Sequence, residues 1–162
     1  MKFDDFRAGQ VLTYGPATLS EAQILAFARE YDPQWFHVDV ERAKTGRWQG
    51  LIASGWQTCG IAMRLAGEGA LRGSESFGSP GLDYLKWPAP VRPGDLLTLV
   101  AEVLEVRRSE RQPTLGILRW RWRLLNQDDV AVLELVATNL FDLAVTDTEV
   151  GPPGIEPGTK RL

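Results

Sequence analysis

The segment that most constrains the fold is a strict alternation of apolar residues and arginines between residues 118 and 124. The apolar members are Leu118, Trp120, Trp122 and Leu124, and the arginines are Arg119, Arg121 and Arg123. A period of two predicts a β-strand with one buried face and one solvated face. The polar turn at residues 126–129 predicts a hairpin with the next apolar run, which carries Leu133, Leu135, Ala137 and Phe141 on one face. Residues 96–106 are also extended in character, so we expect at least three long antiparallel strands.

Two helices are predicted before these strands. Ser20 and Gln23 form a capping-box pattern, so the first helix is expected to begin near Ser20. It should end at Asp32, because Pro33 disfavours helical geometry in the residue before it. The second helix is predicted to begin at Ser54-Gly55 and to be ended by glycines, namely Gly67, Gly69 and Gly73.

The second helix is apolar or small on several sides, which is typical of a buried helix. The pattern therefore predicts the α+β class, with one antiparallel sheet wrapped around one apolar helix. We expect a single domain over residues 1–143. Residues 144–162 are rich in proline and glycine and are predicted to form a mobile C-terminal tail.

Composition excludes several kinds of site. The 162 residues have a net charge of −3, which argues against a general nucleic-acid binder. Cys59 and His37 are the only residues of their types, so an internal disulfide and a Cys/His zinc site are excluded within one chain. No apolar run is long enough for a membrane span, and the N-terminus lacks the apolar region of a secretory signal. We expect a cytoplasmic protein with no metal, cofactor, nucleic-acid or membrane partner.

The first segment that could carry chemistry contains Asp32 and His37, which are separated by a proline-containing loop. A carboxylate and an imidazole can hold one water between them, with one group taking a proton while the other donates one. The alternative is structural, with Asp32 ending a helix and His37 packed on Trp35 and Phe36. For an isolated Asp/His pair the structural interpretation is the more common one.

The second such segment is residues 50–55, which open the buried helix. Unpaired N–H groups and a partial positive charge at a helix N-terminus could hold a carbonyl oxygen that becomes negative during reaction. Gly55 would let a substrate approach the backbone closely. Ser54 can serve as an ordinary N-cap at the same time, because its side chain and the backbone amides are different groups.

Together these segments resemble the MaoC-like family of (R)-specific enoyl-CoA hydratases and dehydratases. The family motif is Asp-x-Asn-Pro-x-His, and Asp32 and His37 keep its spacing. Residues 50–55, Gly-Leu-Ile-Ala-Ser-Gly, resemble the family's Gly-x-Ile-Ala-His-Gly. Residues 90–95 resemble its Pro-Val-x-x-Gly-Asp before a long strand. The chain departs from the pattern at Pro33, at Gln34 in the Asn position, and at Ser54 in the His position.

The resemblance implies a hotdog fold, in which an antiparallel sheet wraps a long apolar helix, and a homodimer. It implies reversible hydration of a 2-enoyl-CoA, with Asp32 and His37 activating water and with Gly55 and Ser54 at the thioester oxygen. The expected pocket residues are Gln34, Trp35, Phe36 and Trp56. The thioester carrier would be coenzyme A or an acyl-carrier protein, in fatty acid metabolism. Two alternatives remain, a hotdog thioesterase and a non-catalytic acyl-thioester binder, the latter because the Asn-Pro pair is altered.

Overall fold

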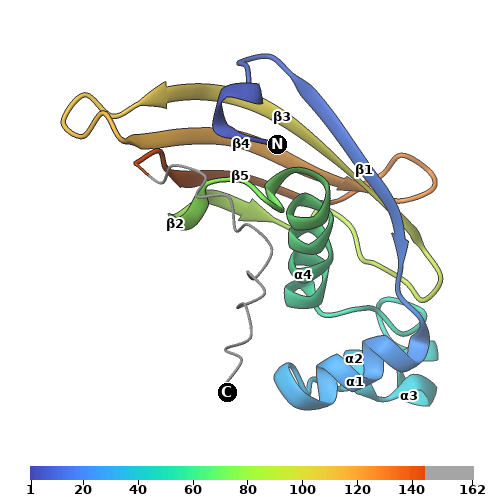
Figure 1. Ribbon diagram of the computed structural model, residues 1–162. Coiled ribbons are helices and arrows are strands. Elements are labelled where there is room, and N and C mark those ends of the chain that lie inside the picture. Colours follow the sequence, from blue (N-terminus) through green and yellow to red (C-terminus); the bar gives the residue numbers. More distant parts are fainter. Residues whose placement is uncertain (145–162) are drawn as a thin grey trace, which may run out of the picture.

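The computed structural model describes residues 1–144 and shows one curved antiparallel sheet wrapped around helix α4 (Gly55–Ala66) (Figure 1). The five strands lie in the order β1-β3-β4-β5-β2. Their bounds are β1 (Val11–Thr18), β2 (Ser76–Lys86), β3 (Leu96–Arg108), β4 (Leu115–Leu125) and β5 (Ala131–Asp142). This is the hotdog arrangement of the α+β class, so the predicted fold is confirmed. The predicted tail lies outside the described residues except for Ala144.

The core lies between α4 and the concave face of the sheet. The alternation in β4 has the predicted effect, because Trp120 is fully buried and Trp122 is 4% exposed. In the hairpin, Trp122 pairs with Leu135 and Trp120 with Ala137. The arginines of β4 lie on the other face, where Arg121 forms a cross-strand ion pair with Glu102 of β3 at 2.9 Å. The outer face is thus partly neutralised by ion pairs.

Helix α4 begins where predicted, and its last residue is Ala66, with Gly67 as the C-cap. A further helical turn follows directly at Gly67–Leu71, so Gly69 lies inside this turn and does not end a helix. Gly69 serves packing instead, because a Cβ on it would lie 2.2 Å from the Tyr14 ring. The helical segment has ended at Gly73, whose φ of +74° is in the region that favours glycine.

Helix α1 (Glu21–Tyr31) has the predicted capping box, in which Ser20 Oγ accepts the Gln23 N–H at 3.1 Å. It ends at Asp32, as expected from Pro33. After α1 come two short helices that the sequence did not indicate, α2 (Trp35–Val38) and α3 (Val40–Lys44). A short helical turn, η1 (Phe3–Asp5), lies at the start of the chain, before β1.

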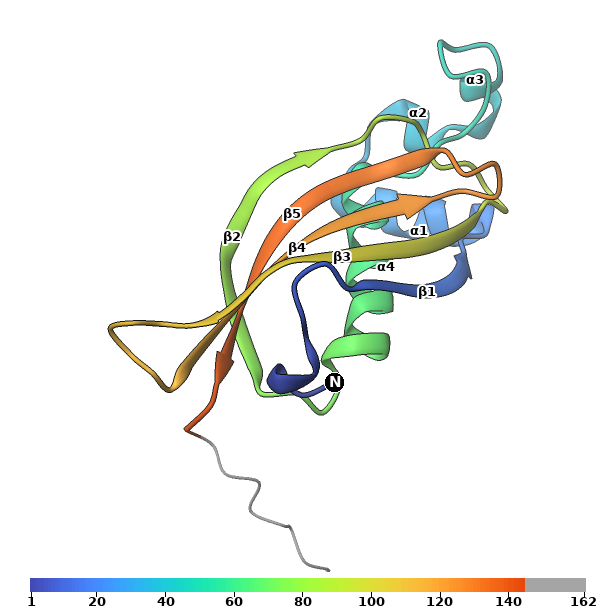
Figure 2. The same cartoon turned by 90° about the horizontal axis from the view of Figure 1, so that it is seen from above.

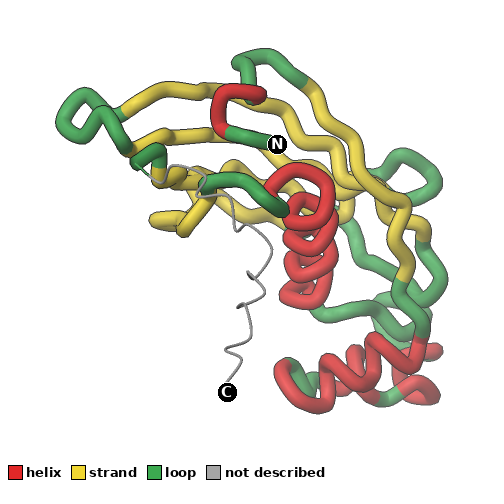
Figure 3. Tube along the Cα trace, in the orientation of Figure 1, coloured by secondary structure: helices red, strands yellow, loops and turns green. Residues whose placement is uncertain are grey.

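Figure 3 shows that α1, α2 and α3 lie together below the N-terminal end of α4, and Figure 2 shows the sheet running along α4. Over residues 1–144, no helix is both long and apolar enough to cross a membrane. The arrangement brings the loop after α1 to the first turn of α4.

Candidate active site

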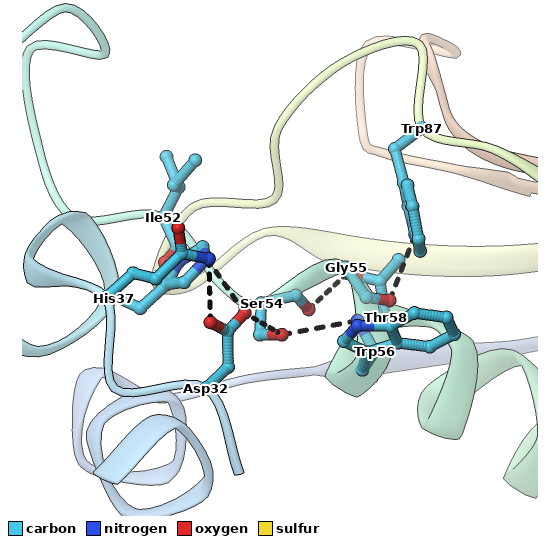
Figure 4. A network of polar contacts seen from close by, with 9 residues as sticks. Asp32, His37, Ile52, Ser54, Gly55, Trp56, Thr58 and Trp87 are labelled. Carbon is cyan, nitrogen blue, oxygen red and sulfur yellow. Dashed lines mark hydrogen bonds and ion pairs between the residues drawn. The ribbon is translucent and has the colours of Figure 1, made fainter.

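Asp32 and His37 meet at the N-terminal end of α4 (Figure 4). His37 Nε2 lies 3.2 Å from Asp32 Oδ2, and the two side chains are 5% and 14% exposed. Pro33 ends α1 at Asp32, and the chain then turns at once into α2, which carries His37. The local sequence therefore folds both side chains onto the same point, and the two candidate residues of the first motif are in contact.

The orientation of the His37 ring is set by the backbone. Its Nδ1 lies 2.7 Å from the carbonyl oxygen of Ile52. A carbonyl only accepts hydrogen bonds, so we assign a proton to Nδ1, which leaves Nε2 facing Asp32. Nε2 lies 3.2 Å from a carboxylate oxygen, a distance at which a proton carried by either atom can form a hydrogen bond between them. The geometry therefore allows a proton to pass between the two side chains.

Asp32 is held by two neutral donors as well. Ser54 Oγ donates to Oδ2 at 2.7 Å and Gln34 Nε2 donates to Oδ1 at 2.8 Å. Burial raises the pKa of Asp32. The hydrogen bonds from Gln34 and Ser54 and the charge of His37 lower this pKa, and together they outweigh the effect of burial. The net pKa lies below the ordinary value, so Asp32 is held in its ionised form.

Ser54 connects the carboxylate to the helix. Its hydroxyl donates to Asp32 and accepts the backbone N–H of Trp56 at 3.3 Å, so it caps α4 as predicted. The side chain is fully buried. Ser54 was expected to contact the thioester oxygen directly. In the structure it does not line the cavity, and its side chain contacts Asp32 from within the protein.

The pair opens onto a cavity of about 320 Å³. Gly55 lines it, and within residues 1–144 the Gly55 N–H donates to no acceptor. Such an unpaired amide at a helix N-terminus can stabilise a developing negative charge. The pocket therefore combines an Asp/His pair, whose side chains are in contact, with an unpaired backbone N–H at a helix N-terminus.

Most of the predicted pocket residues line this cavity, namely Gln34, Phe36 and Trp56. Trp35 does not. Its ring packs against Gly46, and the guanidinium of Arg42 stacks over it at 4.2 Å. Trp48, an aromatic residue close to the motifs in sequence, also lines the cavity, whereas sequence reasoning missed the remaining lining residues, which are Thr58, Trp87, Ala89 and Val132. For Trp87 a signal existed, because it directly precedes the proline-rich approach to β3.

Comparisons of the sequence and of the structure with known proteins point to the same family. Residues 5–118 match the family model described as a MaoC like domain. The chain is 37% identical over 134 residues to the uncharacterized protein YdeM of Bacillus subtilis, covering 83% of this chain and 94% of that protein. It is 31% identical over 91 residues to 3-hydroxyacyl-thioester dehydratase Z of Mycobacterium tuberculosis, covering 55% of this chain and 60% of that protein.

Among solved structures, the MaoC-like dehydratase from Rhodospirillum rubrum superimposes with a TM-score of 0.79 and 34% identity. The alignment covers 86% of this chain and 94% of that one. The agreement of family model, relatives and structure shows that this chain belongs to the MaoC-like dehydratase family.

Proposed function

We propose that this protein adds water reversibly to a 2-enoyl thioester, or in reverse dehydrates a 3-hydroxyacyl thioester. The single observation that carries the proposal is the contact of His37 Nε2 with Asp32 Oδ2 in the same pocket as the unpaired N–H of Gly55. Hydration needs one group that accepts a proton, one that gives a proton, and a donor for the thioester oxygen. In this proposal Asp32 and His37 supply the first two groups, and Gly55 supplies the third.

In the hydration direction, Asp32 and His37 hold the water over the double bond. One of the pair takes a proton from water as its oxygen bonds to the β-carbon, and the double-bond electrons move onto the thioester oxygen. The Gly55 N–H stabilises this enolate. The other member of the pair delivers a proton to the α-carbon, and the carbonyl re-forms. Passage of one proton across the 3.2 Å contact restores the starting state.

The acyl carrier in this proposal is coenzyme A, with an acyl-carrier protein as the alternative because the chemistry at the thioester is the same. The related dehydratase from Mycobacterium tuberculosis is named for 3-hydroxyacyl thioesters, which supports this substrate class. Phe36 and Trp56 give the pocket aromatic walls against which an acyl group can pack.

We also propose a homodimer. Strand β2 is a sheet edge, and its Phe77 and Leu82 are 60% and 48% exposed. Next to it, an apolar groove of about 280 Å³ runs between α4 and the sheet. An exposed edge strand with apolar side chains is a surface that a second copy can cover. Light scattering at the mass of one subunit would count against this arrangement.

The test of the activity is the absorbance of a short 2-enoyl-CoA after addition of the purified protein, with His37→Gln as control. We expect the absorbance to fall with the wild type alone. A thiol-reactive dye in a parallel sample should stay unreacted, because hydration releases no free coenzyme A. Dye reaction would instead indicate a thioesterase, and tight binding without any absorbance change would indicate a binding protein.

A further inference from the structure

Trp87 lies over the first residue of α4. It follows directly after β2, and its indole Nε1 donates to the backbone oxygen of Gly55 at 3.0 Å (Figure 4). Trp87 and Gly55 both line the cavity that contains Asp32 and His37. A side chain from the far end of a strand thus holds the backbone of the helix N-terminus at the reaction site.

The contact depends on the absence of a side chain at residue 55. A Cβ on Gly55 would lie 2.5 Å from Trp87 Cε2 and 2.7 Å from Nε1, closer than real Cβ contacts. The backbone of Gly55 does not itself require glycine, since its φ is not positive. The space, and not the conformation, is what glycine supplies here.

The peptide unit between Gly55 and Trp56 is held at both of its polar atoms. Trp87 donates to its oxygen, and Ser54 Oγ accepts its N–H at 3.3 Å. Both contacts therefore act on this one peptide plane, in addition to the helical bonding of α4. The plane just before it carries the unpaired Gly55 N–H, and the two planes are joined at the Gly55 Cα.

Trp87 is itself supported by Trp56. The two rings meet edge to face, with centroids 5.3 Å apart. Trp56 forms a wall of the cavity but has no side-chain hydrogen bond to the helix backbone among the contacts of residues 1–144. The two tryptophans therefore form a pair in which only the Trp87 side chain is hydrogen-bonded to the helix backbone, whereas Trp56 is itself a residue of α4 whose ring packs against Trp87.

We propose that Trp87 is a positioning residue, which fixes the direction of the Gly55 N–H and so the point at which the thioester oxygen is stabilised. This inference rests on the proposed hydration activity. A small misplacement of a group that stabilises a transition state lowers the rate without removing ground-state binding. The effect of losing the Trp87 hydrogen bond should therefore appear in kcat.

The kinetic experiment compares Trp87→Phe with Trp56→Phe. Trp87→Phe keeps an aromatic ring but removes the N–H, and we expect kcat to fall about tenfold with KM nearly unchanged. Trp56→Phe trims the cavity wall, and we expect its main effect in KM. An unchanged kcat in Trp87→Phe, or a loss seen only in KM, would overturn the proposal.

A second variant pair tests the packing against Gly55. Gly55→Ala alone should lower kcat strongly, because its new methyl group displaces the Trp87 ring. In a Trp87→Ala background the methyl group has room, so the same substitution should cost at least several-fold less. Equal costs in both backgrounds would show that Trp87 does not act through Gly55. Circular dichroism of each variant checks that the fold is retained.

A readout that needs no turnover separates this inference from the proposed function. In the ¹⁵N–¹H spectrum of the protein, we expect Trp87→Phe to move the Gly55 and Trp56 amide resonances more than does Trp48→Phe, which changes a cavity-lining tryptophan that is not next to Gly55 in the chain. Smaller or equal shifts would overturn the positioning role even in an active enzyme. If the wild type hydrates no enoyl thioester, the hydration proposal fails, and these shifts still decide whether Trp87 orients the helix N-terminus.

Discussion

The Ser54 hydroxyl joins Asp32 to the first turn of α4, donating to Oδ2 at 2.7 Å while it accepts the Trp56 N–H. In this way the carboxylate and the helix N-terminus are held by one buried atom. Because the proposed reaction uses a proton at Asp32 and an amide at Gly55, their spacing matters. The bridge through Ser54 keeps that spacing constant.

Ser54→Ala is expected to lower kcat/KM about tenfold, which is the effect of losing one hydrogen bond to a charged group. The bond from Ser54 lowers the pKa of Asp32, so its loss should raise that pKa. The acidic limb of the pH–rate profile should then move to higher pH. A profile that keeps its acidic limb in place would contradict the role of Ser54. Unfolding by urea shows whether the lost helix cap also lowers stability.

Asp32→Asn and His37→Gln should each lower kcat/KM by about a thousandfold or more, because the two residues act as one proton-sharing unit. For the same reason, the double variant should be little worse than either single one. Rates are compared at saturating and at low substrate for all three proteins. If the two losses multiply, the residues act independently and the shared-proton mechanism is wrong.

The stability of the protein should depend on Asp32 in acid. The folded pKa of this carboxyl lies below its ordinary value, so its ionisation contributes stability that is fully present above the unfolded pKa. That contribution is lost as the pH falls through the folded pKa. The free energy of unfolding of wild type relative to Asp32→Asn, measured in urea, should therefore shrink between neutral pH and about pH 3. If the difference in unfolding free energy between wild type and Asp32→Asn instead grew toward acid pH, the pKa of Asp32 would be raised in the folded state, and the hydrogen bonds described here would not explain it.

Gly69→Ala should destabilise the protein by roughly 1–3 kcal/mol, because the new methyl group overlaps the Tyr14 ring. Gly60→Ala is the matched control within α4, since a Cβ there meets nothing within 4 Å. In the control, helix propensity alone should stabilise by up to about 1 kcal/mol. Chemical unfolding of both variants gives the comparison, and equal changes would rule out the packing role of Gly69.

The central part of the fold could be predicted from sequence, whereas both edge strands could not. Strict alternation identified β4, and the turn after it identified β5. Strands β1 and β2 contain Pro16 and Pro80, each beside a glycine, and so have the pattern of turns. Proline is tolerated there because an edge strand leaves some N–H positions unpaired. Edge position is a property of the whole sheet and is invisible in a local window.

In the candidate site, too, local sequence predicted some features, whereas others depend on the folded chain. The spacing of Asp32 and His37 around Pro33 indicated the pair. The contact of Asp32 with Ser54 was not indicated, because it joins segments that meet only in the folded chain. Trp35 was expected in the pocket from its neighbours, yet it lies on the side of α2 that packs on Gly46. On a helical turn, adjacent residues point in different directions, and adjacency is therefore a poor guide to a shared pocket.

The distribution of indoles gives this protein an optical reporter of its own. Three of its six tryptophans, Trp48, Trp56 and Trp87, line the cavity and are 41%, 60% and 42% exposed. Trp120 and Trp122 lie in the core instead. The intrinsic fluorescence should therefore divide into a solvent-accessible component at the cavity and a shielded one, and a ligand that fills the cavity would change mainly the first.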